Sequence, residues 1–445
     1  MSIRIYNTLT HKKEPLTPIE PDHVKLYVCG ITSYDYCHIG HARSSLAFDM
    51  IVKYLRYRGY RVTFVRNFTD IDDKIINRAN EQQTSSEELA NRFIDEFYQD
   101  MDYLGLERPD IEPKATEHIP EMIALITALI DKNKAYPANG DVYYAVSEFS
   151  DYGKLSRRNL DDMQAGARIT INEKKHNPMD FALWKSSKPG EPAWESPWGP
   201  GRPGWHIECS AMSKKYLGDT FDIHGGGKDL IFPHHENEIA QSEAANEAPF
   251  VNMWIHHGFV TVRNEKTAEA EKMSKSLGNF LTIRELSKKF HPETLKLFVF
   301  STQYRNPLEY SEQAMQDAES GLVRLYECVA GYHALSKNAD PAAVSVITDK
   351  ESSRLTSLEQ RFQQAMDNDF NSAQAIGQLF DAAKVINKVI GKLGSKQAPK
   401  DLQLIEKSVE ILVNLAQVMG ILSEPAQQFL ENRKRSILAD IDIDE

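Results

Sequence analysis

The chain has few cysteines, no long apolar run and no excess of positive charge, and each absence excludes a class of protein. Four scattered cysteines in 445 residues argue against a disulfide framework and leave metal binding, catalysis or burial as their roles. No stretch approaches the roughly 20 apolar residues of a membrane span, and no signal peptide opens the chain. We therefore expect a cytoplasmic protein with no membrane partner.

The net charge limits the classes of partner, and the length limits the number of domains. The formal net charge of -12 at pH 7 argues against nonspecific nucleic-acid binding, although a local basic stripe on an acidic protein can still neutralise phosphates. A chain of 445 residues is too long for one core, and 41% hydrophobic and 26% charged residues are ordinary for a globular protein. Two or three domains are expected.

A cysteine and a histidine paired with a carboxylate lie close together in the middle of the chain. Pro233 opens a segment of helical composition, in which residues four apart share a face. His234 therefore lies over Glu238, while His235 is paired with the apolar residue that follows Glu238. With Cys209 they form a sulfur, nitrogen and oxygen set that suits zinc, its fourth ligand coming from elsewhere. The alternative is a surface helix beside a buried cysteine.

A strand, a glycine turn and a helix follow one another near the N-terminus. The pattern predicts a strand over 24–30, a helix over 42–58 and a second strand over 60–68, with the turn at the carboxyl edge of a parallel sheet. The His-x-Gly-His turn at 38–41 places backbone N–H groups and a helix end under a phosphate, and its histidines can donate to developing charge. Taken alone, this four-residue pattern is about as consistent with a chance turn as with a nucleotide-binding site.

The sheet is predicted to be split by roughly a hundred residues. Helices are expected over 87–104 and 120–132 and a strand over 141–146, followed by an irregular segment over 174–204 that is rich in Pro, Gly and Trp.

A second glycine turn, at 225–227, is expected between a strand over 219–224 and the histidine-containing helix. Asp229 is placed to accept from ribose hydroxyls, although a glycine triplet can equally be a plain tight connection. Farther on, a charged loop over 263–271 leads to Lys272 and Lys275. These lysines can close over a polyphosphate or can simply be solvated charges.

Beyond residue 310 the composition predicts a helical domain. Its helices are expected over 312–333, 353–366, 373–390 and 401–419. Lys384, Lys388 and Lys392 recur every four residues, a spacing that could follow a phosphate backbone or could form a solvated face.

Two motifs together, His38-Ile39-Gly40-His41 and Lys272-Met273-Ser274-Lys275-Ser276, match the paired signature of class I aminoacyl-tRNA synthetases. Longer segments at 27–32, 67–74, 204–210 and 224–227 resemble the cysteinyl-tRNA synthetase family in particular. The resemblance runs from about residue 3 to about residue 420. It implies ATP-dependent ligation of L-cysteine to tRNA through cysteinyl-adenylate, with ATP and Mg²⁺ and one zinc ion per chain.

The resemblance also implies roles for individual residues. The zinc ligands would be Cys29, Cys209, His234 and Glu238. The cysteine pocket would be formed by Gly30, Thr69, Trp205 and His224. ATP would bind at Gly40, Gly226, Gly227, Asp229 and Lys275. The catalytic residues would be His38, His41, Lys272 and Lys275.

The implied fold is α/β, with a Rossmann-like parallel sheet split by a connective insertion and followed by an all-α helical bundle. The expected parts are the two halves of the catalytic domain at 1–112 and 205–250, the connective insertion at 113–204, a stem-contact region with the lysine loop at 251–315, a helical tRNA-binding domain at 316–420 and a C-terminal tail at 421–445. A monomer is expected.

Two departures from the family and two alternatives remain. The loop at 264–270 is longer than usual, which predicts slower closure, and the chain ends before the family's small anticodon-recognising module, which predicts weaker anticodon dependence. A ligase that joins cysteine to a small amine would share the zinc and both nucleotide motifs. A zinc-stabilised RNA-binding protein without catalysis would leave His38 and Lys275 without a role.

Overall fold

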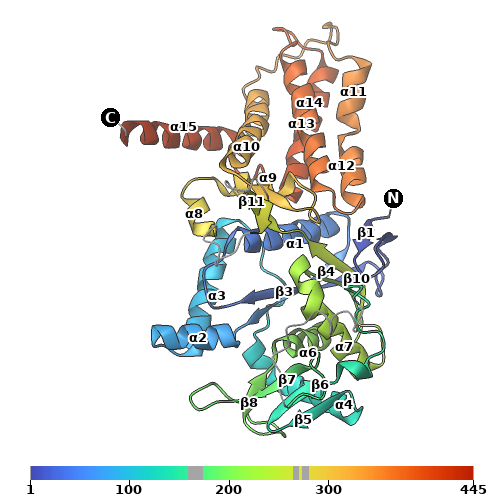
Figure 1. Ribbon diagram of the computed structural model, residues 1–445. Coiled ribbons are helices and arrows are strands. Elements are labelled where there is room, and N and C mark those ends of the chain that lie inside the picture. The colour runs from blue at the N-terminus through green and yellow to red at the C-terminus, as the bar shows by residue number, and fades with distance from the viewer. Residues whose placement is uncertain (1, 159–173, 264–269, 273–279, 444–445) are drawn as a thin grey trace.

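The computed structural model describes residues 2–158, 174–263, 270–272 and 280–443, which form three stacked parts (Figure 1). An antiparallel sheet lies at one end, a parallel sheet with its helices in the middle, and a bundle of long helices at the other end. The expected fold class is therefore confirmed: α/β with a parallel sheet split by an insertion, followed by a helical bundle.

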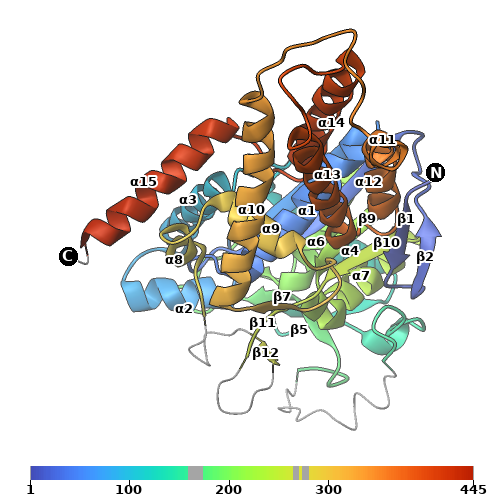
Figure 2. The same ribbon diagram turned by 90° about the horizontal axis from the view of Figure 1, so that it is seen from above.

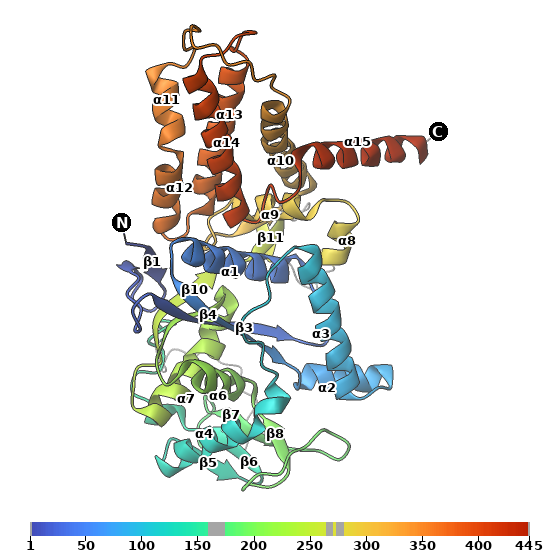
Figure 3. The same ribbon diagram turned by 180° about the vertical axis from the view of Figure 1, so that it is seen from behind.

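The central parallel sheet has the strand order β10-β9-β3-β4. Its strands are β3 (His23–Thr32), β4 (Arg61–Thr69), β9 (Phe221–Gly227) and β10 (Val251–His257). Since β3 pairs with both β4 and β9, the halves of the chain before and after the insertion form one sheet, with all carboxyl ends at one edge. Helix α1 (Ile39–Tyr57) covers one face, and α6 (Trp205–Leu217) and α7 (Glu236–Asn246) cover the other (Figure 3).

The insertion is more regular than its composition predicts. It contains a four-stranded antiparallel sheet of β5 (Ala135–Ala138), β6 (Asp141–Tyr144), β7 (Phe181–Ser186) and β8 (Gly201–Pro203). The prediction of an irregular segment over 174–204 is therefore wrong for β7 and β8. Trp184 of β7 is fully buried, which explains why a segment rich in Trp packs as a sheet.

Helices and 3-10 turns connect the sheets. They are α2 (Asp73–Gln82), α3 (Ser86–Tyr103), the 3-10 turns η1 (Ala115–His118) and η2 (Val146–Glu148), and α4 (Ile119–Asp131).

Near the second glycine motif one prediction is wrong and another is confirmed in part. Gly225, Gly226 and Gly227 belong to strand β9 rather than to a turn. A Cβ at Gly225 would lie 2.3 Å from the Phe48 ring of α1, so glycine permits close packing of helix on strand. After the 3-10 turn η3 (Lys228–Leu230), the segment with Pro233 forms a π-helical turn, η4 (Ile231–His235), and α-helix begins only at α7. The predicted pair of His234 and Glu238 is formed, at 3.0 Å.

The charged segment predicted as a loop over 263–271 is partly a hairpin. Strand β11 (Val260–Arg263) pairs antiparallel with β12 (Ala270–Lys272) and parallel with β13 (Leu308–Tyr310). The longer loop and Lys275 fall within 264–269 and 273–279, outside the described residues. Helices α8 (Ile283–Ser287) and α9 (Pro292–Phe300) follow.

The helical part consists of α10 (Glu312–His333), α11 (Asp349–Thr356), α12 (Leu358–Asp367), α13 (Ser372–Ile390) and α14 (Pro399–Val418). The helix predicted over 353–366 is two helices, α11 and α12. The segment 421–445, predicted as a tail, contains α15 (Ala426–Ile443), which projects away from the bundle (Figures 2 and 3). The hairpin of β1 (Arg4–Asn7) and β2 (Lys12–Pro15) lies beside β10.

The lysine stripe is partly neutralised within the bundle. Glu351 lies 3.0 Å from the amine of Lys388 and 2.7 Å from that of Lys392. These two lysines are therefore engaged in ion pairs. Among the described residues, no helix is long and apolar enough to span a membrane.

Candidate active site

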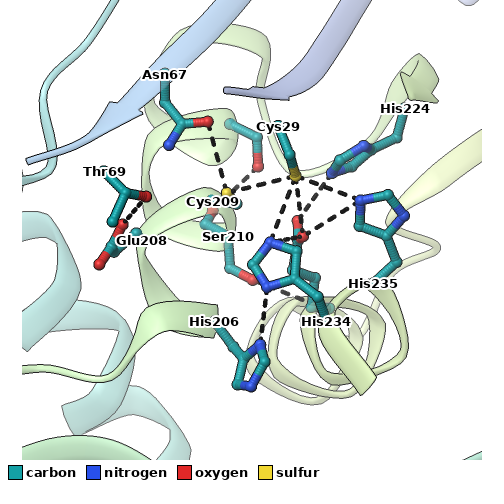
Figure 4. Close-up of polar contacts among 12 residues, drawn as sticks. Cys29, Asn67, Thr69, His206, Glu208, Cys209, Ser210, His224, His234 and His235 are labelled. Carbon is teal, nitrogen blue, oxygen red and sulfur yellow. Dashed lines mark hydrogen bonds and ion pairs between the residues drawn. The ribbon is translucent and has the colours of Figure 1, made fainter. Parts of the chain in front are cut away.

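Four donor side chains from separate parts of the chain converge at the carboxyl edge of the parallel sheet (Figure 4). We call Cys29, Cys209, His234 and Glu238 the donor cluster, because one ligand atom from each lies within 4.8 Å of the others. The sulfur of Cys29 is 3.6 Å from that of Cys209, 3.4 Å from His234 Nε2 and 3.5 Å from Glu238 Oε1. His234 Nε2 and Glu238 Oε1 are 3.0 Å apart.

These separations fit a tetrahedral zinc site. Zinc bonds of about 2.0–2.3 Å imply edges of about 3.3–3.8 Å between the donors of a tetrahedron. The three distances from the Cys29 sulfur fall within that range, and the fourth is slightly shorter. A mixed thiolate, imidazole and carboxylate set also matches the ligand preference of zinc. The residues present therefore fit the metal that the sequence predicts.

Each donor is fixed by its element. Cys29 lies near the end of β3, Cys209 is on the buried face of α6, His234 is in η4 and Glu238 is in the first turn of α7. His206 and His234 face each other with 2.8 Å between their Nδ1 atoms. This contact orients the His234 ring so that Nε2 points to the cluster.

Protons are shared unevenly among the donors. Burial disfavours the Glu238 carboxylate, but His224 and His234 outweigh this and lower its pKa to about 2. Burial likewise opposes the charged form of His234, but Glu238 raises its pKa to about 10. Burial raises the pKa of Cys29 well above its ordinary value, and the hydrogen bond from Cys29 helps to lower the pKa of Cys209 to about 6 despite its own burial. A cation would displace the shared protons.

His235 is a residue that the sequence analysis missed. Its Nε2 lies 3.3 Å from the Cys29 sulfur, so a second possible metal-binding group of Cys29, His224, His235 and Glu238 overlaps the donor cluster. The helical template placed His235 on another face because it assumed α-helix from Pro233, whereas η4 is a wider turn. The adjacent pair of histidines was the available signal.

The residues predicted for the cysteine pocket surround the cluster in different ways. The Trp205 ring stacks on His234 with centroids 4.1 Å apart, and His224 Nε2 lies 2.8 Å from Glu238 Oε2. Thr69 donates to the buried carboxylate of Glu208 at 2.7 Å, away from the donors. A Cβ at Gly30 would lie 1.5 Å from the Asn67 carbonyl oxygen, so this position admits only glycine.

A cavity of about 670 Å³ runs from Cys29, the member of the donor cluster that lines it, to the His-Gly-His turn at 38–41. Cys29, Gly30, His38, Gly40, His41, Gly227 and Asp229 are among the residues that line it. Gly226 is not, because it faces His235 and Leu230, whose atoms would lie 2.9 Å from an added Cβ. Three of the residues predicted to bind ATP, Gly40, Gly227 and Asp229, therefore line the same cavity as Cys29. Lys275 lies outside the described residues.

The turn at 38–41 caps helix α1. The Gly40 N–H donates to His38 Nδ1 at 3.0 Å, the His38 N–H donates to His41 Nδ1 at 3.2 Å, and the two rings stack 4.0 Å apart. The positive end of α1 therefore faces the cavity. Phe280 packs edge-on against His38, which places the residue after 273–279 beside this turn.

Two family models match the chain. The model described as "tRNA synthetases class I (C) catalytic domain" matches residues 15–320, and the DALR domain matches residues 361–423. A cysteine–tRNA ligase of Desulfotalea psychrophila is 66% identical over 445 residues, covering 100% of this chain and 90% of that protein. The chain belongs to the cysteine–tRNA ligase family.

A second relative and two solved aminoacyl-tRNA synthetase structures are also similar to the chain. The cysteine–tRNA ligase of Geobacter metallireducens is 54% identical, with 100% of this chain and 90% of that protein covered. Mycobacterium tuberculosis methionyl-tRNA synthetase in complex with methionyl-adenylate superposes with a TM-score of 0.68 at 16% identity, covering 92% of this chain and 93% of that one. A putative arginyl-tRNA synthetase of Campylobacter jejuni gives 0.61 at 13% identity, covering 90% and 94%. These two likenesses show the fold alone.

Proposed function

We propose that the protein attaches L-cysteine to tRNA in two steps within the cavity that runs from Cys29 of the donor cluster to the His-Gly-His turn. In the first step the carboxylate of cysteine attacks the α-phosphate of ATP, which forms cysteinyl-adenylate and releases pyrophosphate. In the second step a ribose hydroxyl at the end of the tRNA attacks the acyl carbonyl, which releases AMP. The single observation that carries this proposal is the shared cavity wall of Cys29, His38 and His41.

The donor cluster would select the amino acid. Zinc bound there would accept a thiolate as a further ligand, whereas the hydroxyl of serine would stay protonated and gain little. His224 holds the second oxygen of Glu238 at 2.8 Å, and the Trp205 ring covers His234, so both ligands are held in place before substrate binds. Selection on binding would remove the need for a separate hydrolytic site for serine.

The opposite wall would hold ATP. The backbone N–H groups at the start of α1 can bind phosphate oxygens, and Asp229 can accept from the ribose. His38, His41, Lys272 and Lys275 would stabilise the charge on the reacting phosphate and the leaving pyrophosphate. Mg²⁺ would arrive with ATP, and no ligands are assigned to it.

The tRNA enzyme is favoured over a ligase for small amines. The relatives are named cysteine–tRNA ligases, which supports a tRNA acceptor. The helical part, which contains the DALR match, also adds a surface that a small acceptor would not need. A monomeric state, a cytoplasmic location and the domain limits given above stay predictions.

Two assays on the purified protein test the proposal. Pyrophosphate exchange into ATP should depend on L-cysteine and not on L-serine, and the protein should then charge tRNA with cysteine. Exchange without charging would favour the small-amine ligase. The absence of cysteine-dependent exchange would reject both enzymes.

A further inference from the structure

Asp369 is a buried carboxylate that lies outside the cavity and the donor cluster, in the segment joining α12 to α13. Its Oδ1 accepts from the Tyr6 N–H at 2.9 Å and from the Tyr304 hydroxyl at 2.8 Å. Its Oδ2 accepts from Gln303 Nε2 at 3.1 Å and from Arg305 Nε at 2.7 Å. One side chain from the helical part thus joins the N-terminal hairpin to residues 303–305.

The backbone at Asp369 is held in an unusual conformation. Asp369 has φ 65° and Phe370 has φ 48°, in the left-handed region that bulky residues rarely adopt. The Asp369 N–H donates to the Arg4 carbonyl at 2.8 Å, and the Phe370 side chain is fully buried. Strained backbone persists where the surroundings over-determine it, and such sites concentrate at functional positions.

A second buried side chain continues from residues 303–306 to the cavity. Arg43, on α1 just after the His-Gly-His turn, donates to the carbonyls of Tyr304 at 3.1 Å, Asn306 at 2.5 Å and Gly258 at 3.0 Å. Gly258 lines the cavity, and a Cβ there would lie 2.3 Å from the Asn306 oxygen. Contacts therefore run without interruption from Asp369 through Tyr304 and Arg43 to the cavity wall.

We infer that Asp369 is a positioning residue for the transfer of cysteine to tRNA. It fixes the position of the helical part, which would hold the tRNA, relative to the cavity in which the adenylate would form. This inference rests on the proposed function. A misplacement of about 1 Å between reacting groups can cost about 100-fold in rate, so a rigid connection between the two parts matters for the step in which they share a substrate.

Activation of cysteine should depend on Arg43 rather than on Asp369. Arg43 anchors Gly258, Tyr304 and Asn306 to α1 from the catalytic side, and none of these three contacts passes through Asp369. ATP and cysteine bind within the cavity and need only this anchor. The tRNA needs both.

The test compares Asp369→Asn with the unchanged protein in two assays at a temperature where both are folded. The amide keeps the shape of the carboxylate but puts donor hydrogens against the Gln303 and Arg305 donors. Single-turnover transfer from preformed cysteinyl-adenylate to tRNA should fall by about tenfold or more, while cysteine-dependent exchange should stay within about threefold. Tyr304→Phe, which removes one donor and keeps the ring, should give a smaller loss of transfer that is not additive with Asp369→Asn.

Asp401→Asn is the matched control. Asp401 is also buried, but among the described residues its carboxylate accepts within the helical part, from the Ser345 hydroxyl and from the Val346 N–H at 2.8 Å. This variant should retain both activities. Normal transfer in Asp369→Asn, an equal loss of exchange and transfer, or an equal loss of transfer in Asp401→Asn would each overturn the inference. If the unchanged protein showed no cysteine-dependent exchange, the proposed function itself would fail.

Discussion

Four donor side chains from four elements meet within 4.8 Å beside the end of the cavity that Cys29 lines, whereas the turn at 38–41, the start of α1 and the end of β9 contribute residues to its other end. Cys209, His234 and Glu238 are buried and Cys29 is partly buried, and each donor contacts another cluster member or a neighbouring histidine. At the other end, backbone at the start of α1 lines the cavity, where it can bind phosphate oxygens. A small cation thus requires side chains fixed in advance, while a polyphosphate can be bound mainly by backbone and by the end of a helix.

The largest effect is expected from a change in the donor cluster. Cys209→Ser replaces a thiolate donor with a hydroxyl that stays protonated, so both zinc content and cysteine-dependent exchange should be abolished. Metal analysis of the purified protein and the exchange assay measure the two. Full zinc content in this variant would remove Cys209 from the ligand set.

A smaller effect is expected at the nucleotide end. Lys275→Ala should lower the activation rate by about 2–4 kcal/mol in the transition state, because it removes a charge donor for the leaving pyrophosphate, with zinc content unchanged. Lys289, which pairs with Glu312 at 3.1 Å on the surface, supplies the matched control. Unchanged exchange in Lys275→Ala, or an equal loss in Lys289→Ala, would contradict this role.

The nucleotide end also contains a histidine that should affect stability in acid. Burial, aided by Arg43, lowers the pKa of His257 to about 4. Between pH 6.5 and 4 the unfolded chain binds the proton and the folded chain does not, so the free energy of unfolding falls as the pH falls through this window. When the pH is lowered from 7 to 4.5, the free energy of unfolding should therefore fall by about 1–3 kcal/mol less in His257→Gln than in the unchanged protein. Urea unfolding at both pH values measures it, and equal losses would contradict the assignment.

The smallest effect is expected from a cysteine outside the cluster. Cys37 is buried in a different hydrophobic cluster from the one that contains Cys209 and contacts Cys29, and it is assigned no ligand role. Cys37→Ser should retain zinc and cysteine-dependent exchange. If Cys37 rather than Cys29 proved necessary for metal, the donor cluster described here would be wrong even if the enzyme class were right.

Sequence patterns were sufficient for the long periodic elements but not for the short ones. Helix α10 matches its predicted limits because a long amphipathic pattern leaves little choice. The glycines at 225–227 predict a turn, because a sequence cannot show that the Phe48 ring lies against β9. The strands β7 and β8 are not predicted because their segment is rich in Pro and Gly, and because a sequence pattern does not show that β7 pairs with β6 on the far side of the preceding segment.

The same limit applies to the donor cluster. Helical spacing predicts that His234 and Glu238 lie together, whereas Cys29, 205 residues before His234, is predicted only by the resemblance. His235 was missed because η4 departs from α-helix just where the two histidines lie. Local geometry that departs from the regular template is set by tertiary packing, which a sequence pattern does not contain.

The central claim is that a metal in the donor cluster recognises the thiolate of the substrate. The most direct measurement is the visible spectrum of the cobalt-substituted protein, titrated first with L-serine and then with L-cysteine. About one metal per chain and a spectral shift with cysteine alone are predicted, as expected for a new sulfur ligand. A spectrum indifferent to cysteine would show that the metal is structural and that the amino acid is selected in another way.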